Sequence, residues 1–326
     1  MHKLARYTKG VVSGTGKFRM KVWMSLVLAP IATVLLPLSA WAALKTQVVE
    51  YKHGNTVLEG YLAYDDAVTT PRPGVMVVHD WTGVGDYVKQ RTEQLAKMGY
   101  VAFAADIYGK GIRPTNPKDA AAEAGKYRGN RPLLRDRANA GLAILKQNPM
   151  VDPNKIAAIG YCFGGGTVLE LARSGAPVAG VVSFHGNLDT PNPADAKNIT
   201  AKVLVLHGAS DPFVPEAQVN AFNKEMNDAG VDWQLIAYGG VVHSFTNPKA
   251  GNDKSKGSAF DAVADQRSFA AMKQFFGEIF AKPLSSLLPS ESTPTKATVP
   301  APAPRIPYPG RLRDRGTGIY RPSGTR

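Results

Sequence analysis

The segment AAIGYCFGGGTV, residues 157–168, decides the fold prediction for this chain. Small and apolar residues lead into Gly160, and Cys162, the only cysteine among 326 residues, sits inside a glycine cluster. A strand that turns sharply into a helix through G-x-C-x-G is typical of a nucleophile elbow, in which the turn lifts the reactive side chain clear of the sheet. The flanking positions must be small, and Gly160 and Gly164 meet that need. We therefore predict that Cys162 is a nucleophile.

Two other interpretations of this segment compete with a nucleophile. A buried structural cysteine is the commoner fate of a free thiol. A glycine-rich turn can also hold a phosphate, but the Lys-Ser/Thr pair of a P-loop does not follow Gly166. The positive end of the following helix would favour the negatively charged thiolate of Cys162 and so lower the pKa of the thiol. A free cysteine has a pKa of about 8.5, so even a small downward shift matters near neutral pH.

Strands and helices alternate on both sides of the elbow. Short apolar runs predict strands, and three- to four-residue apolar spacing predicts helices. This alternation favours an α/β fold with a mostly parallel central sheet and helices on both faces. The predicted strands are 46–51, 56–64, 74–79, 101–105, 155–161, 180–184, 202–206 and 233–238; the predicted helices are 86–98, 117–127, 132–147, 165–173, 215–229 and 258–280.

A cysteine nucleophile of this kind needs a base and an acid that orients the base, and the fold predicts the order nucleophile, acid, histidine. His243 lies in a loop after the last strand, whereas His185 precedes any suitable acid loop and His207 directly ends a strand. Asp211 follows the penultimate strand within the turn 208–212. We favour His243 and Asp211; the weaker candidates for the acid are Asp189 and Asp232.

The three segments GYCFGG, GASDPFVP and HSF, in this order over residues 45–282, resemble the dienelactone hydrolase family of α/β-hydrolases. The resemblance implies an α/β-hydrolase fold, a Cys162–His243–Asp211 triad, and hydrolysis of an ester or lactone. It implies that Cys162 forms a thioester, that His243 moves the protons, and that Asp211 holds the imidazole tautomer. The oxyanion would be held by the backbone N–H groups of Phe163 and Trp81.

Asp80 takes the position at which the resembled family carries a glutamate beside the thiol. A carboxylate there would oppose thiolate formation through like-charge repulsion. We expect that substrate binding moves Asp80 away and so activates Cys162 only in the loaded enzyme. The alternative is that Asp80 caps its own loop and never meets the sulfur.

The substrate pocket departs from the family pattern at two positions. Members that cleave dienelactones hold a substrate carboxylate with two arginines, and the matching residues are Lys110 and Asn247. The lysine attracts an anion only as a point charge, and Asn247 carries no charge. Arg113 could replace the missing arginine, but the sequence does not show where its side chain lies. The nearby aromatic residues suggest an apolar pocket or ordinary packing: Trp81, Tyr108, Phe163 and Phe245.

The basic character of the chain lies at its two ends. Residues 1–42 and 283–326 carry +6 and +5 of the formal net charge of +13. A basic groove for nucleic acid in the middle segment is therefore not expected. Residues 283–326 are rich in Pro, Ser, Thr and Arg, so we predict a disordered tail that either contacts anions or is a solvated extension.

The N-terminal segment has the grammar of a cleaved secretory signal. Three basic residues precede the apolar run 22–38, and Ala40-Trp41-Ala42 follows it. We predict that residues 1–42 are a signal peptide and that the mature domain, 43–282, is secreted or periplasmic. The alternative is a retained membrane anchor, but the run is short and contains Pro30. Met20 would make a more ordinary start.

We expect neither a cofactor nor a metal, because the histidines are scattered and a lone cysteine cannot build a cluster. The sequence leaves the natural substrate and the oligomeric state open. Two alternatives to an ester or lactone hydrolase also stay open. One is a non-catalytic binding protein on a hydrolase scaffold, and the other is an enzyme that cleaves thioesters or peptides with the same triad.

Overall fold

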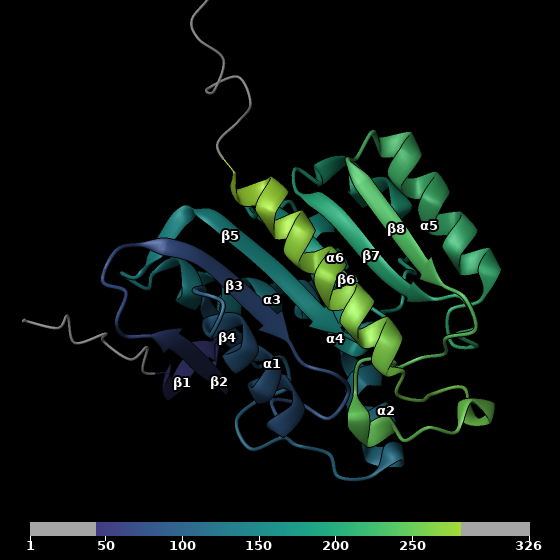
Figure 1. The fold of residues 1–326 in the computed structure, drawn as a ribbon, viewed down its shortest axis with the longest axis horizontal. Coiled ribbons are helices and arrows are strands. Elements are labelled where there is room, and N and C mark those ends of the chain that lie inside the picture. Colours follow the sequence, from purple (N-terminus) through teal and green to yellow (C-terminus); the bar gives the residue numbers. More distant parts are fainter. Residues whose placement is uncertain (1–43, 282–326) are drawn as a thin grey trace, which may run out of the picture. The chain divides into compact units, whose positions relative to one another are not determined.

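The structure, a computed structural model, describes residues 44–281 of the chain. The predicted signal peptide, 1–42, and the predicted tail, 283–326, lie outside these residues. The described segment folds around one eight-stranded sheet, and Figure 1 shows helices in front of it and behind it.

The sheet has the strand order β1-β2-β4-β3-β5-β6-β7-β8. The pairs β1–β2 and β2–β4 are antiparallel, and every other pair is parallel. The central strands are short apolar runs buried on both faces, as parallel strands between two helix layers must be. The strands are β1 (Leu44–His53), β2 (Thr56–Asp65), β3 (Arg72–Val78), β4 (Val101–Ala105), β5 (Val151–Tyr161), β6 (Gly180–Phe184), β7 (Lys202–Gly208) and β8 (Trp233–Tyr238).

Three of the six α-helices begin after a residue whose side chain accepts a bond from a free backbone N–H group. Asn116, Asn130 and Asp261 accept such a bond at the starts of α2, α3 and α6. No helix within residues 44–281 is both long enough and apolar enough to cross a bilayer. The helices are α1 (Asp86–Ala96), α2 (Pro117–Arg128), α3 (Arg131–Lys146), α4 (Phe163–Arg173), α5 (Glu216–Ala229) and α6 (Ala262–Phe280), with 3-10 turns at Pro193–Asn198, Pro248–Ala250 and Lys254–Lys256.

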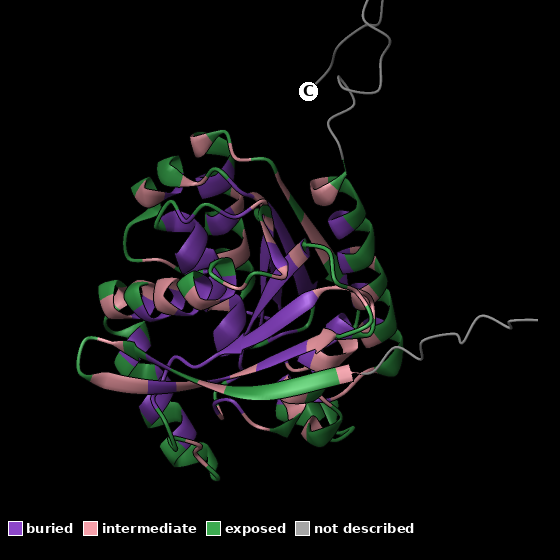
Figure 2. Ribbon diagram, turned by 90° about the vertical axis from the view of Figure 1, so that its left-hand side faces the viewer, coloured by how far each residue is buried: buried purple, intermediate pink, exposed green. Residues whose placement is uncertain are grey.

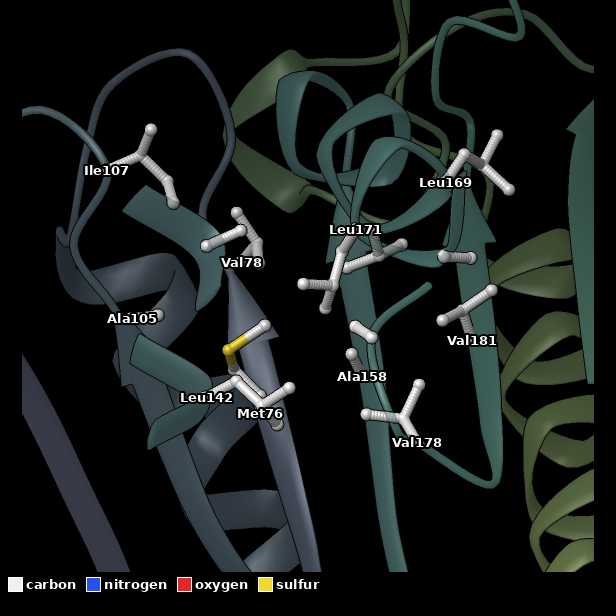
Figure 3. Packing of buried hydrophobic residues seen from close by; sticks show 14 of the residues in the cluster. Met76, Val78, Ala105, Ile107, Leu142, Ala158, Leu169, Leu171, Val178 and Val181 are labelled. Carbon is white, nitrogen blue, oxygen red and sulfur yellow. The ribbon is translucent and has the colours of Figure 1, made fainter. Parts of the chain in front are cut away.

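The sheet separates two hydrophobic clusters. Buried side chains of α2, α3, α4 and α5 form one cluster, and those of α1 and α6 form the other. Along β4, Phe103 belongs to the first cluster and Ala102 and Ala104 to the second, as the alternation of strand side chains requires. Figure 3 shows part of the first cluster, where Met76 lies beside Ala158 of the neighbouring strand.

Burial follows these layers closely. Figure 2 shows buried strands in the interior, exposed outer surfaces on the helices, and a largely exposed strand at one edge. That edge strand is β1, in which only Tyr51 is fully buried. The α/β-hydrolase architecture that the sequence predicts is therefore confirmed.

The strand order reverses between β3 and β5, which lie side by side although β4 follows β3 in the sequence. In open α/β sheets, ligands bind at the carboxyl ends of the strands at such a switch point. The segment that begins at His79 leaves the end of β3, and Cys162 leaves the end of β5. The topology therefore brings these two segments together.

The predicted element ends differ from the structure in three informative places. Helix α4 begins at Phe163 rather than Gly165, because the chain turns into the helix directly at Cys162. Strand β5 begins at Val151, four residues before the predicted start at Lys155. Helix α6 begins at Ala262 rather than Ser258, because Asp261 caps it and residue 258 pairs with the loop of His243.

Candidate active site

The turn at Cys162 has the geometry of a nucleophile elbow. Its backbone is at φ 54° and ψ −113°, a conformation that side-chain-bearing residues rarely adopt, between the end of β5 and the start of α4. A Cβ atom added at Gly160 would overlap the carbonyl of Gly164, and one added at Gly164 would overlap the carbonyl of Val78. The prediction that both positions must be small is confirmed.

The three residues selected from the sequence as a triad form one hydrogen-bonded chain. His243 Nε2 lies 3.1 Å from Cys162 Sγ, and His243 Nδ1 lies 2.7 Å from Asp211 Oδ2. The second carboxylate oxygen of Asp211 accepts the Phe213 N–H at 2.8 Å, so the acid has a fixed orientation. The side chains of Cys162, His243 and Asp211 are all buried.

The backbone of His243 is also fixed. Its N–H donates to the Gly257 carbonyl at 3.1 Å, and its carbonyl accepts the Ala259 N–H at 3.0 Å. The candidate acids that were not favoured lie elsewhere: Asp189 pairs with Arg131, and Asp232 pairs with Lys202.

The electrostatics of His243 favour its charged form. Burial lowers its pKa, but the neighbouring Cys162 sulfur and the Asp211 carboxylate outweigh burial and raise the pKa to about 10. An imidazolium beside the sulfur is what a thiolate–imidazolium pair requires.

The loop after β3 is held from both sides, in a way that the sequence does not reveal. The Nδ1–H of His79 donates to the Asp80 carbonyl at 2.6 Å, and its Nε2 accepts the Ile107 N–H at 3.2 Å. The hydroxyl of Tyr108 donates to the Trp81 carbonyl at 3.2 Å. Within residues 44–281, the N–H groups of Trp81 and Phe163 donate to no protein acceptor. They are therefore free to bind an oxygen of a substrate.

A cavity of about 680 Å³ opens over Cys162. The structure places Asp80, Trp81 and Asn247 on its wall, as expected. It places three other residues off the wall: Lys110, Tyr108 and Phe245.

The substrate-binding prediction is corrected for these three. The ammonium of Lys110 pairs with Glu50 of β1 at the surface, so it does not face the cavity. Tyr108 is buried and supports the Trp81 loop. Phe245 is fully buried beneath the wall, edge-on to the ring of His185.

Arg113 does line the cavity, but its guanidinium is engaged by protein groups. It donates to the carbonyls of Val84 and Ile112 at 3.0 and 2.8 Å. The carboxylates of Glu59 and Asp106 lie 3.6 and 3.7 Å away. Arg113 thus braces the loops around the cavity.

Asp80 also serves its own loop. Its Oδ1 atom accepts the N–H and the hydroxyl of Thr82 at 2.8 and 2.5 Å. This is the loop cap that the sequence offers as the alternative, although Asp80 lies on the same cavity wall as Cys162. The gating role stays a prediction.

A second histidine, disfavoured as the base because of its place in the sequence, also lies at this site. The Nδ1 atom of His185 accepts the N–H of Cys162 at 3.1 Å, and its ring centroid lies 5.3 Å from that of His243. Phe213, which sequence reasoning passed over, stands edge-on to the His243 ring with centroids 5.4 Å apart. In the part of the chain that the structure describes, no cluster of three His, Cys, Asp or Glu residues could hold a metal ion.

Comparison with known proteins identifies the family. A putative carboxymethylenebutenolidase of Aquifex aeolicus is 30% identical over 211 residues, which cover 62% of this chain and 88% of the relative. A probable 2-oxo-3-(5-oxofuran-2-ylidene)propanoate lactonase of Bradyrhizobium is 28% identical, covering 62% of this chain and 86% of the relative. A solved dienelactone hydrolase-like promiscuous phosphotriesterase from metagenomic libraries is 41% identical with a TM-score of 0.70, covering 73% of this chain and 100% of its own. The sequence model of the dienelactone hydrolase family matches residues 58–280, so the chain belongs to that family.

Proposed function

We propose that this protein hydrolyses carboxylic esters or lactones through a thioester formed on Cys162. The observation that carries the proposal is the chain from Cys162 Sγ to His243 Nε2 at 3.1 Å and from His243 Nδ1 to Asp211 at 2.7 Å. The names of the Aquifex and Bradyrhizobium relatives, a putative butenolidase and a probable lactonase, agree with this class of reaction.

In the first half of the reaction, the Cys162 thiolate attacks the acyl carbon, and the carbonyl oxygen becomes an oxyanion. The free N–H groups of Phe163 and Trp81 donate to that oxygen, which stabilises the tetrahedral intermediate. The intermediate collapses when the carbon–oxygen bond to the leaving group breaks. The His243 imidazolium gives its Nε2 proton to the departing alkoxide, and the acyl group stays on Cys162 as a thioester.

In the second half, the sulfur is neutral, so one of the charges that raise the pKa of His243 is gone. Neutral His243 then takes a proton from water, and the resulting hydroxide attacks the thioester carbon. Expulsion of the Cys162 thiolate releases the acid and restores the ion pair. Asp211 keeps the second proton of the ring on Nδ1 throughout, so Nε2 always faces the reacting atoms.

The cavity favours an uncharged acyl group. Its wall exposes the aromatic rings of Trp81 and Phe213, which are 37% and 53% accessible. Three cationic side chains lie on the wall: Arg113 is engaged as described, the ammonium of Lys249 lies 3.5 Å from the carboxylate of Asp86, and Arg128 bonds the neutral amide of Asn187. The carboxylates of Asp80 and Asp86 lie on the same wall and would repel a substrate carboxylate. We therefore propose aryl or alkyl esters and neutral lactones as better substrates than lactones that carry a carboxylate.

The test is hydrolysis of a short-chain aryl ester by the protein and by Cys162→Ala. We expect the variant to lose two or more orders of magnitude in kcat, and wild-type protein to gain the mass of one acyl group during turnover. Lys110→Ala is the matched control, because its side chain lies outside the cavity, and it should keep the wild-type rate.

Equal, near-background rates for wild-type protein and Cys162→Ala, with no acyl mass, would favour the non-catalytic binding protein instead. The substrate panel also includes an aryl phosphotriester. The solved neighbour at 41% identity is described as a promiscuous phosphotriesterase, and a phosphotriester, like a carboxylic ester, carries no net charge. Asp80→Asn tests the gating role in a separate assay: labelling of the resting Cys162 thiol that is faster than in wild type would support that role.

A further inference from the structure

A buried polar chain runs beneath the elbow, away from the Cys162–His243–Asp211 line. The Cys162 N–H is shared between the Phe184 carbonyl at 3.0 Å and His185 Nδ1 at 3.1 Å. The other ring nitrogen, His185 Nε2, lies 2.7 Å from the hydroxyl of Thr246, which in turn lies 2.6 Å from the hydroxyl of Tyr87. His185 and Thr246 are 2% and 0% exposed.

The bond from Cys162 sets the proton position on His185. Because Nδ1 accepts an N–H, it carries no proton, and a neutral ring must then carry its proton on Nε2. That proton is donated to the Thr246 hydroxyl. Burial lowers the pKa of His185 well below its ordinary value, and the nearby His243 lowers it further, so the ring is neutral.

Thr246 belongs to the same loop as His243, three residues further along. Its carbonyl accepts a bond at 2.6 Å from Arg91 Nη2 of α1, and this nitrogen also lies 2.6 Å from the Asp265 carboxylate of α6. The His243 loop is thus anchored to two helices on one side. On the other side, His185 ties it to the backbone of the nucleophile.

We propose that His185 and Thr246 are positioning residues that hold the Cys162 sulfur in register with the His243 imidazole. This inference rests on the proposed cysteine mechanism. The nucleophile comes from the β5–α4 turn and the base from a loop more than eighty residues away, so a small shift between them would break the Sγ–Nε2 contact. His185 is the side chain that bonds both segments.

The neutral state of His185 is part of this arrangement. Its ring stands edge-on to that of His243 with centroids 5.3 Å apart, so a second positive charge there would oppose the imidazolium of His243. Titratable and charged groups from several elements face His185: Cys162, Tyr161, His243 and Arg91. Tyr87 reaches it through the hydroxyl of Thr246.

The experiment measures the alkylation rate of Cys162 by iodoacetamide between pH 5 and 10, together with kcat and KM for the aryl ester. Thr246→Val keeps the shape and removes the acceptor for His185. We expect it to lower the alkylation rate at pH 7 and kcat by about tenfold to a hundredfold while KM changes little, as for a small misplacement of reacting groups. The rate should also become more pH-dependent, rising toward alkaline pH, because less thiolate is present near neutrality.

Two further variants separate positioning from packing. Thr246→Ser restores the hydroxyl and should bring both rates back to within about threefold of wild type, because the hydrogen bond returns. Thr92→Val is the matched control: Thr92 is also fully buried, but its hydroxyl bonds only the Val88 carbonyl of its own helix at 2.7 Å. It should keep the wild-type pH profile. His185→Asn retains an acceptor near the Nδ1 position, loses the link to Thr246, and should behave like Thr246→Val.

Three results would overturn the inference. They are a wild-type profile in both Thr246→Val and His185→Asn, the same loss in Thr92→Val, or no recovery in Thr246→Ser. His243→Asn separates this failure from that of the mechanism itself. If its alkylation profile equals that of wild type, no thiolate–imidazolium pair exists and the proposed function fails. If His243→Asn changes the profile and Thr246→Val does not, only the positioning role is lost.

Discussion

Backbone strain is concentrated at the residues that carry the proposed chemistry. Three non-glycine residues within 44–281 have positive φ: Cys162 at 54°, His185 at 39° and Ser244 at 57°. All three line the cavity. Such conformations cost about 1–3 kcal/mol each and persist only where the surroundings impose them. At Cys162 and His185 these surroundings include the bonds from Cys162 N–H to His185 and from His185 N–H to the Leu206 carbonyl.

The pKa of His243, raised to about 10, sets a pH dependence with a definite sign. We expect kcat/KM to stay level across neutral pH and to fall as the pH rises through about 10, where the imidazolium loses the proton that the leaving group needs. Asp211→Asn removes one cause of the raised pKa, so its alkaline limb should move to lower pH. A pH–rate profile of both proteins with the aryl ester is the measurement.

The same shift predicts a stability change. The pKa of His243 is higher in the folded protein than the unfolded value of about 6.5. Its stabilisation is therefore complete below pH 6.5 and is lost as the pH rises through about 10. The free energies of unfolding of the wild type and His243→Asn, measured with denaturant, should differ most on the acid side of this window.

The pH profile of kcat/KM also checks the protonation state. A limb near pH 6.5 in that profile would contradict the charged state assigned to His243.

The catalytic candidates could be predicted because local chemistry marks them. Cys162 stands between glycines, Asp211 in a turn after a strand, and His243 in a loop, in the order that the fold requires. His185 gave no such signal: its bonds to Cys162 and Thr246 join segments 23 and 61 residues apart. The prediction for Lys110 is wrong because its partner Glu50 is 60 residues away on β1, and no local pattern marks that pairing.

At the scale of elements, helices α4 and α5 are joined by a buried ionic cluster. Arg173, which is 0% exposed, donates to Glu225 through Nε and Nη2 at 2.7 and 2.8 Å. It also donates to Glu170 of its own helix at 3.0 Å and to the Leu188 carbonyl at 3.1 Å. Because α4 starts at the nucleophile, this cluster fixes the helix whose N-terminus faces the cavity.

Arg173→Met should destabilise the protein by about 3–5 kcal/mol, because it leaves the buried Glu225 carboxylate without its cation. Lys224→Ala in α5 removes the exposed pair with Asp228 and should cost less than about 1 kcal/mol. The double variant Arg173→Met/Glu225→Leu should recover much of the loss, since it removes the orphaned charge. Denaturant unfolding of the four proteins is the measurement. A loss of under 1 kcal/mol in Arg173→Met would mean that the cluster is not needed for stability.

The elements themselves were predictable from short-range patterns, and their ends were less so. The predicted ranges of β4, β6 and β8 match the observed strands residue for residue. The predicted start of α4 at Gly165 is two residues late, because Gly164 is a poor helix former by propensity alone. Gly164 is helical here because its backbone packs against the end of β3, a contact that a Cβ atom would block.

At the scale of the whole molecule, the strand order explains why two distant loops share one site. Strands β3 and β5 are neighbours, so the free N–H of Trp81 and that of Phe163 lie at the same sheet edge. Strands β7 and β8 extend the sheet on one side, so the turns of Asp211 and His243 reach that edge. The parallel middle of the sheet could be predicted from the alternation of elements. The order of strands could not, since it depends on contacts between segments far apart in the chain.

The uneven charge of the chain predicts that removing its basic ends weakens binding to anionic surfaces and leaves catalysis unchanged. Residues 1–42 and 283–326 hold +11 of the formal +13, whereas every residue placed at the site lies within 44–281. A chain of residues 43–282 should keep kcat/KM for the aryl ester to within about twofold, because it retains every residue placed at the site and the substrate is uncharged, so removed charges act on it weakly in salt. The shortened chain should leave a cation-exchange column at a much lower salt concentration than the full chain. Full-length protein in which glutamine replaces the lysine and arginines of residues 283–326 is the control that changes charge and keeps length. A large loss of kcat/KM in the shortened chain would instead show that a terminal segment contributes to the fold or to the site.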